Sequence, residues 1–474
     1  MLVRPRRWWM ACGAVLLATA GAATGAGLTA VGNRWGAGAM LGLPVAAAML
    51  VVVLSRRSFA IYAFLLTLPF GFIHLGPLQA VELAALLVVA VVAVARSGAG
   101  LPVLPPVPQL AWALALGGVA ALASLRSVDA DATFRANVQL GGGVMLAFAV
   151  TGALTRANHV RRFAWGLVGV ATVMSLPAIQ AAGDQSARFG AAVITGRATG
   201  VFAQPNELGL FSAMALLVAT GVFVSATTAR ARIAAVVAIL AVAASLVLSL
   251  SRGAWLGSVI GVAALVVLLP AFRKRLAVIL LVALAVAGIG LMSAPENPQV
   301  QIIGERLATF TDPSANPYDE RPLIYQEAFR QISERPLLGQ GPGSFPAASA
   351  RAAAGGRTFL AYHAHNALLT VAAEAGIVAA LLVVALTLSL AVTARRTVSV
   401  QIRAGRPADA AITAGLASAL AALAGHGLID YPLRNPVVFL LVWCIVGALL
   451  ASERAAPDVN ASETLAPAKA GALQ

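Results

Sequence analysis

Long apolar runs, repeated along almost the whole chain, constrain the fold more than any other feature of this sequence. The chain has 474 residues, of which 60% are hydrophobic and only 11% are charged. A soluble globular protein carries about 25% charged residues, so a soluble fold of this size is excluded. Intrinsic disorder is excluded too, because disordered chains are poor in hydrophobic residues. The sequence therefore predicts an all-α, polytopic membrane protein.

The number of spans follows from the lengths of the apolar runs. A bilayer core about 30 Å thick requires about 20 apolar residues per helix, which predicts about 14 spans, or 12 if the short, Gly-rich runs are re-entrant. The first run resembles a signal peptide, but the many runs behind it favour an uncleaved anchor. The predicted spans are 8–31, 36–54, 58–74, 78–95, 109–125, 138–154, 163–182, 206–225, 232–250, 253–270, 276–293, 366–393, 409–427 and 436–452.

The basic residues are distributed unevenly among the loops. The formal net charge is +15, and most Arg side chains lie in alternate short loops. Because short cytoplasmic loops are enriched in Lys and Arg, this pattern predicts an even number of spans with both termini in the cytoplasm. The charge therefore indicates membrane orientation, and we expect no nucleic-acid partner.

Two long loops, 183–205 and 294–365, are external in this topology. Their polar, varied composition suggests that the chemistry is located there. The predicted units follow the same division: N-terminal transmembrane helices in 1–182, transmembrane helices with an Arg motif in 183–293, an external helical loop in 294–365, C-terminal transmembrane helices in 366–452, and a disordered cytoplasmic tail in 453–474.

The second long loop is expected to contain structure of its own. Arg321-Pro322 suits the first turn of a helix, and apolar residues recur with helical spacing as far as Glu334. This pattern predicts a short amphipathic helix that lies on the membrane surface. Pro336 ends it, and the following glycines, 339–343, predict a turn with unusual backbone angles.

Arg252 lies between two apolar spans, at the outer boundary of the membrane. An Arg in this position needs a partner or a polar cavity, and its planar guanidinium can bind phosphate through two hydrogen bonds. We therefore favour a functional role, and the alternative is an Arg that reaches the external headgroups.

His363 and His365 end the second long loop. A His at the membrane surface suits a general base or a phosphate-binding group, and the alternative is a helix-capping His-Asn pair. We predict no metal, because no third ligand has suitable spacing. Glu374 lies about 13 Å further along the predicted helix, too far to touch His365, and we expect it to pair with an Arg of another span.

Other polar residues are weaker candidates. Asn206 follows Pro205 at the start of a span, where it either begins the helix or lines a polar cavity. Asp129 and Asp131 form a DxD pattern that some glycosyltransferases use to hold a metal, but in a short polar loop it arises easily by chance. Glu82, His74 and His426 are further weak candidates for a functional site. His159 lies on the cytoplasmic side in the predicted topology.

Four segments resemble the O-antigen ligase and polymerase superfamily of bacterial envelope glycan enzymes. The resemblance lies in their order and topological side, and it covers roughly residues 195–440. A family pattern of His-Asn, nine residues and then Gly is met at His365, Asn366 and Gly376, but Ala379 departs from its last position. The segments are Gly200–Gly209, Ser251–Gly253, Arg321–Tyr325 continued by Arg335–Gly343, and His365–Asn366 with Gly376.

The resemblance implies a C-type glycosyltransferase fold that works without metal or other cofactor at the outer face of the bacterial plasma membrane. The implied donor is a glycan on polyprenyl (undecaprenyl) diphosphate, and the acceptor is a lipid or glycolipid such as lipid A-core, as in lipopolysaccharide biosynthesis. It assigns catalytic roles to Arg252, Arg321 and His365. Further candidates for substrate binding are Asn206, Arg197, Arg306, His363, Asn366, Glu374 and Arg434.

Elementary chemistry agrees with these roles. Two Arg side chains supply charge and geometry to stabilise a departing diphosphate, and a His can take the proton of the acceptor hydroxyl. A polymerase of the same superfamily is the nearest alternative, because only the acceptor differs. A glycolipid transporter without a covalent step is a third hypothesis. Transporters often contain repeated halves, and this sequence shows no obvious repeat, which disfavours this hypothesis.

Overall fold

The computed structural model describes residues 57–75, 78–181, 186–189, 192–274, 298–308, 320–356 and 360–456. Eight helices in these ranges are long and apolar enough to span a membrane, which confirms an all-α polytopic membrane protein. They are α4 (Ala80–Ser97), α6 (Ala130–Ala153), α7 (Ala157–Gln180), α8 (Pro205–Ser225), α9 (Ala229–Leu248), α16 (Ile377–Arg403), α17 (Pro407–Gly427) and α18 (Pro436–Arg454).

Shorter elements complete the described part of the chain. Two apolar helices fall just short of spanning length, α5 (Leu110–Ser124) and α10 (Arg252–Leu268). The other helices are α3 (Arg57–Leu65), α12 (Pro298–Ala308), α13 (Arg321–Glu334), α14 (Phe345–Ala354) and α15 (Ala367–Ala375), with the 3-10 turns η1 (Leu68–Phe70), η2 (Pro270–Phe272) and η4 (Pro432–Arg434). Two antiparallel hairpins pair β1 (His74–Leu75) with β2 (Leu78–Gln79) and β3 (Ser186–Phe189) with β4 (Ala192–Thr195).

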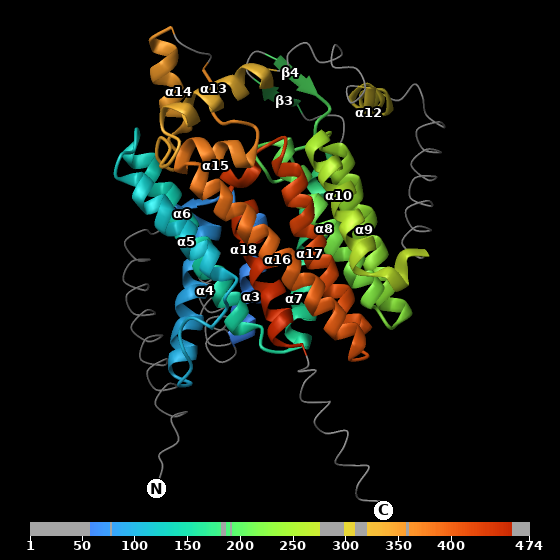
Figure 1. The fold of residues 1–474 in the computed structure, drawn as a ribbon. Helices are drawn as coiled ribbons and strands as arrows, with labels where there is room; N and C mark the ends of the chain where they lie inside the picture. Colours follow the sequence, from blue (N-terminus) through green and yellow to red (C-terminus); the bar gives the residue numbers. More distant parts are fainter. Residues whose placement is uncertain are drawn as a thin grey trace, which may run out of the picture.

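Burial separates central helices from peripheral ones. In α8 and α18, 78% and 83% of an apolar 18-residue stretch is buried inside the protein, whereas the buried share is 28% in α9 and 22% in α16. The apolar surface of α9 and α16 therefore faces lipid, whereas α8 and α18 belong to the core. Helices α12, α13 and α14 and the β3–β4 hairpin lie at the same end of the bundle, with α12 apart from α13 and α14 (Figure 1).

The span predictions agree with long helices at most described positions. The runs 109–125 and 253–270 form the shorter helices α5 and α10, and two further runs differ more clearly. Spans 8–31, 36–54 and 276–293 lie outside the described residues, so the total of 14 stays a prediction. The run 58–74 contains only the nine-residue α3, followed by η1 and the first strand of the β1–β2 hairpin. The predicted span 366–393 forms two helices, α15 and α16, because the helix is interrupted at Gly376.

The break at Gly376 has a clear backbone cause. Gly376 adopts φ +89°, a conformation that costs other residues more than glycine. A Cβ atom at this position would overlap the carbonyl oxygen of Leu337, so only glycine lets the two segments approach this closely. The next residue, Ile377, donates its backbone N–H to Pro336 O at 2.8 Å.

The amphipathic helix predicted to end near Glu334 is confirmed as α13, and its place on the membrane surface stays a prediction. Its buried residues Ile324 and Ala328 pack in one cluster with Phe345 of α14 and Ala373 of α15. Part of the apolar face therefore packs against neighbouring helices, while Leu323 and Phe329 of α13 are exposed. The predicted glycine turn is also confirmed, since Gly339, Gly341 and Gly343 all have positive φ.

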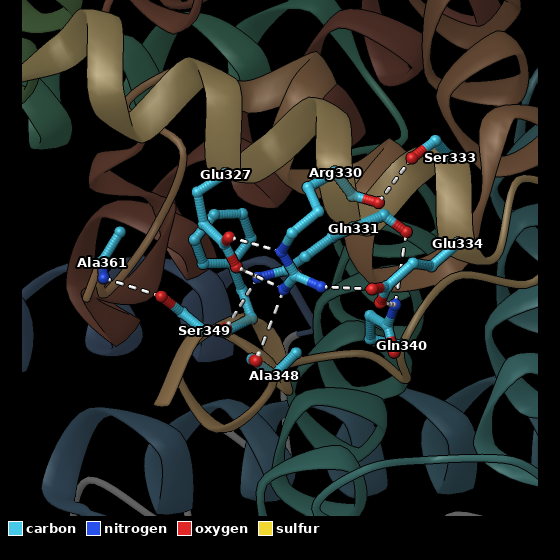
Figure 2. A network of polar contacts seen from close by, with 10 residues as sticks. Glu327, Arg330, Gln331, Ser333, Glu334, Gln340, Ala348, Ser349 and Ala361 are labelled. Atoms are coloured by element: carbon cyan, nitrogen blue, oxygen red, sulfur yellow. Dashed lines mark hydrogen bonds and ion pairs between the residues drawn. The ribbon is translucent and has the colours of Figure 1, made fainter. Parts of the chain in front are cut away.

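A buried polar network joins α13 to α14 (Figure 2). Glu327 is fully buried and accepts hydrogen bonds from Arg330 and Gln331, each at 2.7 Å. Gln331 also donates to Phe345 O at 3.2 Å and Arg330 to Ala348 O at 3.5 Å. Because buried charge is stable only when paired and hydrogen-bonded, this network holds α13 and α14 together as one unit.

Candidate functional site

Four helices begin at a common region of the bundle end. Each start is set locally by its sequence: α8 by a capping box with Pro205 at its first position, α10 by Ser251, and α15 by Asn366, whose side chain accepts the Leu369 N–H at 3.0 Å. In α13, Pro322 occupies the first turn. Since a helix N-terminus carries partial positive charge, four of them together favour an anion.

A chain of hydrogen bonds links side chains from distant segments. Arg197 donates to Asn206 Oδ1 at 2.9 Å, and Asn206 Nδ2 donates to Asp430 Oδ2 at 2.5 Å. The other carboxylate oxygen of Asp430 lies 2.9 Å from His365 Nδ1. A carboxylate only accepts, so Nδ1 carries the proton, and in the neutral ring Nε2 keeps its lone pair for substrate.

Asp430 is the central acid of this network. It lies in the turn between α17 and η4, is only 5% exposed, and has His426 Nε2 3.8 Å from its second oxygen. Burial alone would raise the pKa of this carboxyl, but the neighbouring imidazoles of His365 and His426 hold its pKa well below the usual range. It is therefore an ionised partner that orients His365.

Several guanidinium groups lie near Arg197, which is linked to this carboxylate through Asn206. Burial lowers the pKa of Arg197 to about 9, and the charges of three neighbouring arginines act in the same direction, while Asp430 opposes them. Those neighbours are Arg306, Arg252 and Arg321. Several cations around one acid leave an excess of positive charge, and such a surplus favours an anionic ligand.

His363 lies beside His365 and is neutral. Its ring centroid is 3.9 Å from that of His365, and its Nδ1 accepts the backbone N–H of His365 at 3.2 Å. Burial lowers the pKa of His363 to about 3, with smaller contributions from His365 and from Arg434. His363 therefore adds no charge of its own and supports the backbone of His365.

Strained backbone adjoins two of the predicted catalytic residues. His365 has φ +47° and Leu250 φ +49°, and they are the only non-glycine residues with positive φ in the part of the chain that the structure describes. Such conformations cost about 1–3 kcal/mol and cluster at functional sites. Arg306 Nε donates to Leu250 O at 3.2 Å, which holds the turn that leads into Arg252.

A metal-ligand set not foreseen from the spacing also exists here. The potential ligand atoms of His363, His365 and Asp430 lie within 4.8 Å of one another, so the expectation that a third ligand is missing was wrong. The donor set by itself fits a divalent cation, but the surrounding guanidiniums repel one, and both Nδ1 atoms are already hydrogen-bonded. The prediction of a metal-free site stays a prediction.

The remaining predicted residues have distinct places. Asn366 caps α15 and donates to Leu428 O at 2.8 Å, and Arg434 is exposed in η4. Glu374 was expected to pair with an Arg, but its carboxylate instead accepts the backbone N–H groups of Gly343 and Phe345 at 2.9 and 3.4 Å. Asp129 is the cap of α6 and accepts from Ala132 N, the ordinary role for an acid at a helix start.

Sequence reasoning missed Asp430. One signal was available, because Asp430 is the only acidic residue between Asp409 and Glu453 and lies in a turn between two spans. An acid isolated in this way among apolar spans is functional more often than not. His426 was a weak candidate, and the structure places its imidazole against Asp430.

Taken together, these features define an all-α membrane protein with a candidate site of Arg, His and Asp side chains at one end of its helical bundle. Residues 235–384 match the family model described as O-Antigen ligase, which places this segment in the O-antigen ligase and polymerase superfamily. The chain is thus a multi-pass membrane protein that contains a segment similar to O-antigen ligases. Arg252, Arg306, Arg321 and His365 lie inside the matched segment, and Arg197, Asn206 and Asp430 lie outside it. A comparison with curated proteins gives no match.

Proposed function

We propose that the chain transfers a glycan from polyprenyl diphosphate to a lipid acceptor such as lipid A-core, without a metal, at the outer face of the bacterial plasma membrane. The observation that carries the proposal is the His365–Asp430 pair, in which Nδ1 of His365 lies 2.9 Å from the carboxylate, together with the arginines near Arg197. A base next to an anion-binding region is what glycan transfer from a diphosphate requires.

The proposed reaction is a single displacement at the anomeric carbon. The acceptor hydroxyl oxygen forms a bond to this carbon while Nε2 of His365 takes the hydroxyl proton. The bond from the anomeric carbon to the diphosphate oxygen breaks, and its electron pair leaves with the lipid diphosphate. Arg252 and Arg321 stabilise the charge that develops on the leaving group, and the anomeric configuration inverts.

The side of the membrane is part of the proposal. Arg side chains in alternate short loops favour cytoplasmic termini, which puts the start of α8, α10, α13 and α15 on the periplasmic side. A donor that arrives linked to a lipid needs no nucleotide site, and the arginine group at the membrane boundary suits its diphosphate.

A polymerase is the second candidate, because it shares the donor chemistry and differs only in acceptor. Reconstitution in vesicles with a polyprenyl-diphosphate glycan separates the two when a lipid A-core acceptor and a second lipid-linked repeat are offered in parallel. We expect the lipid A-core to be elongated, and transfer to persist in EDTA. Elongation of the repeat alone would establish a polymerase, loss of transfer in EDTA would exclude the metal-free mechanism, and transport without any new glycosidic bond would identify a transporter.

The Asp430→Asn variant is expected to lower kcat by roughly 10²-fold, the size of loss that follows from a misplaced catalytic group, with little change in the KM of the donor. The amide no longer holds the Nδ1 proton of His365 as a carboxylate does. Initial transfer rates in vesicles test this. Asp409→Asn is the matched control, because Asp409 pairs with Arg161 at 2.7 Å away from the site, and equal activity of both variants would remove Asp430 from the proposal.

A further inference from the structure

Glu374 joins two parts of the site without reaching the reaction itself. It lies in the last turn of α15, the helix that begins directly after His365 and Asn366. Its carboxylate accepts the N–H groups of Gly343 and Phe345 at 2.9 and 3.4 Å, and Phe345 is the first residue of α14. An acid from one helix thus caps the start of another.

The cap of α14 must come from outside because its own cap residue is engaged elsewhere. Ser344 makes no capping hydrogen bond from its side chain, and its hydroxyl lies 3.0 Å from Ser127 Oγ and 3.1 Å from Thr133 Oγ1. A carboxylate at a helix N-terminus is favoured by the unsatisfied N–H groups and by the helix dipole. Glu374 supplies that carboxylate.

Backbone hydrogen bonds reinforce the same junction. Gln340 N donates to Ala373 O at 2.9 Å and Gly341 N to Glu374 O at 2.8 Å. Gly339 has φ +63°, and a Cβ atom there would overlap the backbone of Glu374. The glycine turn therefore lies directly on the C-terminal end of α15. The Glu374 carboxylate adds a charged side-chain hydrogen bond to these backbone contacts.

The other ends of the two helices lie at the site. Helix α13 begins at Arg321 and packs beside α15 through Ile324, Ala328 and Ala373. Ile324 near the start of α13 belongs to the same cluster as Ala364, next to His365, and the charge of Arg321 lowers the pKa of His363, so the N-terminal ends of both helices lie on the same side. The two helices therefore run in the same direction, joined at their C-terminal ends through Glu374, α14 and the Glu327 network that links α14 to α13 (Figure 2).

We infer that Glu374 is a positioning residue that sets the placement of Arg321 relative to His365, by capping α14 and so locking the α13–α14 unit onto α15. This inference rests on the proposed function, in which Arg321 holds the diphosphate and His365 takes the proton. Two groups that act on one transition state must keep their separation, since a shift of about 1 Å can cost 10²-fold in rate.

Glu374→Ala in the full-length protein, reconstituted in vesicles, tests the inference. We expect kcat to fall by at least about 10-fold with little change in donor KM, because binding survives while alignment is lost. Glu374→Gln is expected to lose part of the activity, since Oε2 and Oε1 of Glu374 each accept one N–H group, whereas the single amide oxygen of Gln replaces only one of these acceptors. Glu334→Gln is the matched control, because Glu334 pairs with Arg330 at 2.6 Å and contacts Gln340 at 3.5 Å, and among the described residues its side chain has no contact with α15.

Hydrogen exchange, measured without substrate, provides a readout independent of activity. In Glu374→Ala we expect faster exchange at the amides of Gly343 and Phe345 and also at those of Ile324 and His365, at the far ends of the two helices. Faster exchange at the first pair alone, or a normal kcat in a variant whose junction has opened, would overturn the inference. If the unaltered protein transfers no glycan, the proposed function fails, and exchange at Ile324 and His365 still decides whether Glu374 positions these ends. If Glu374→Ala does not fold, the same exchange measurement on Glu374→Gln and Glu334→Gln decides. Faster exchange at Ile324 and His365 in Glu374→Gln alone supports the inference, and equal exchange in the two variants overturns it.

Discussion

His365→Ala is expected to reduce glycan transfer by about 10³–10⁴-fold, at the upper end of the contribution of a general base. The structure gives the reason, because Asp430 holds Nδ1 at 2.9 Å and directs the other ring nitrogen to the substrate side. His365→Gln should be nearly as inactive, since an amide cannot take a proton at neutral pH. Transfer rates in vesicles, normalised to the amount of protein in the membrane, measure the loss.

His159→Ala is the control for this experiment. His159 lies in the first turn of α7, and its backbone oxygen, not its ring, accepts the hydrogen bond of Tyr62. The substitution removes an imidazole of the same size and leaves that contact intact. Full activity of His365→Ala beside an unaffected His159→Ala would exclude His365 as the base and, with it, the proposed displacement.

Arg252→Ala and Arg321→Ala are each expected to lower kcat by about 10²–10³-fold, as does the loss of one preorganised donor to a developing negative charge. The Lys variants should be nearly as damaging, because an ammonium lacks the planar fork that binds two phosphate oxygens. Both residues begin a helix at the site, α10 and α13, so the dipole of each helix adds to the charge of its first side chain.

A matched arginine outside the site distinguishes this effect from a general loss of charge. Arg351 is exposed in α14 and donates to Val128 O at 2.9 Å, and Arg351→Lys is expected to retain the activity of the unaltered protein. Lys variants of Arg252 and Arg321 that transfer at the normal rate would show that charge alone suffices there. The two-point phosphate contact would then be wrong.

Membrane class and most of the span positions could be predicted from the sequence because they depend on local properties. The free energy of inserting a helix into lipid depends on some 20 consecutive residues, and those residues are adjacent in the chain. The start of α13 at Arg321 could be predicted for the same reason, since Pro322 and the apolar spacing after it are local signals. The positive φ values at Gly339, Gly341 and Gly343 follow from residue type as well.

Predictions that depend on a partner distant in the chain failed or were incomplete. The break at Gly376 is caused by the backbone of Leu337, and nothing in the apolar run 366–393 indicates that this backbone lies against it. Glu374 was expected to meet an Arg because a buried acid needs compensation, but backbone N–H groups of a distant turn provide it.

Residue types thus determined by themselves that this chain spans a membrane many times, and that arginines and a histidine gather at the ends of its apolar segments. Only the tertiary structure decided that His365 meets Asp430, 65 positions further along, and that Asn206 and Arg197 complete the same chain of hydrogen bonds. The physical reason is that insertion into lipid is a property of each segment, whereas a site between helices depends on which of their ends pack together.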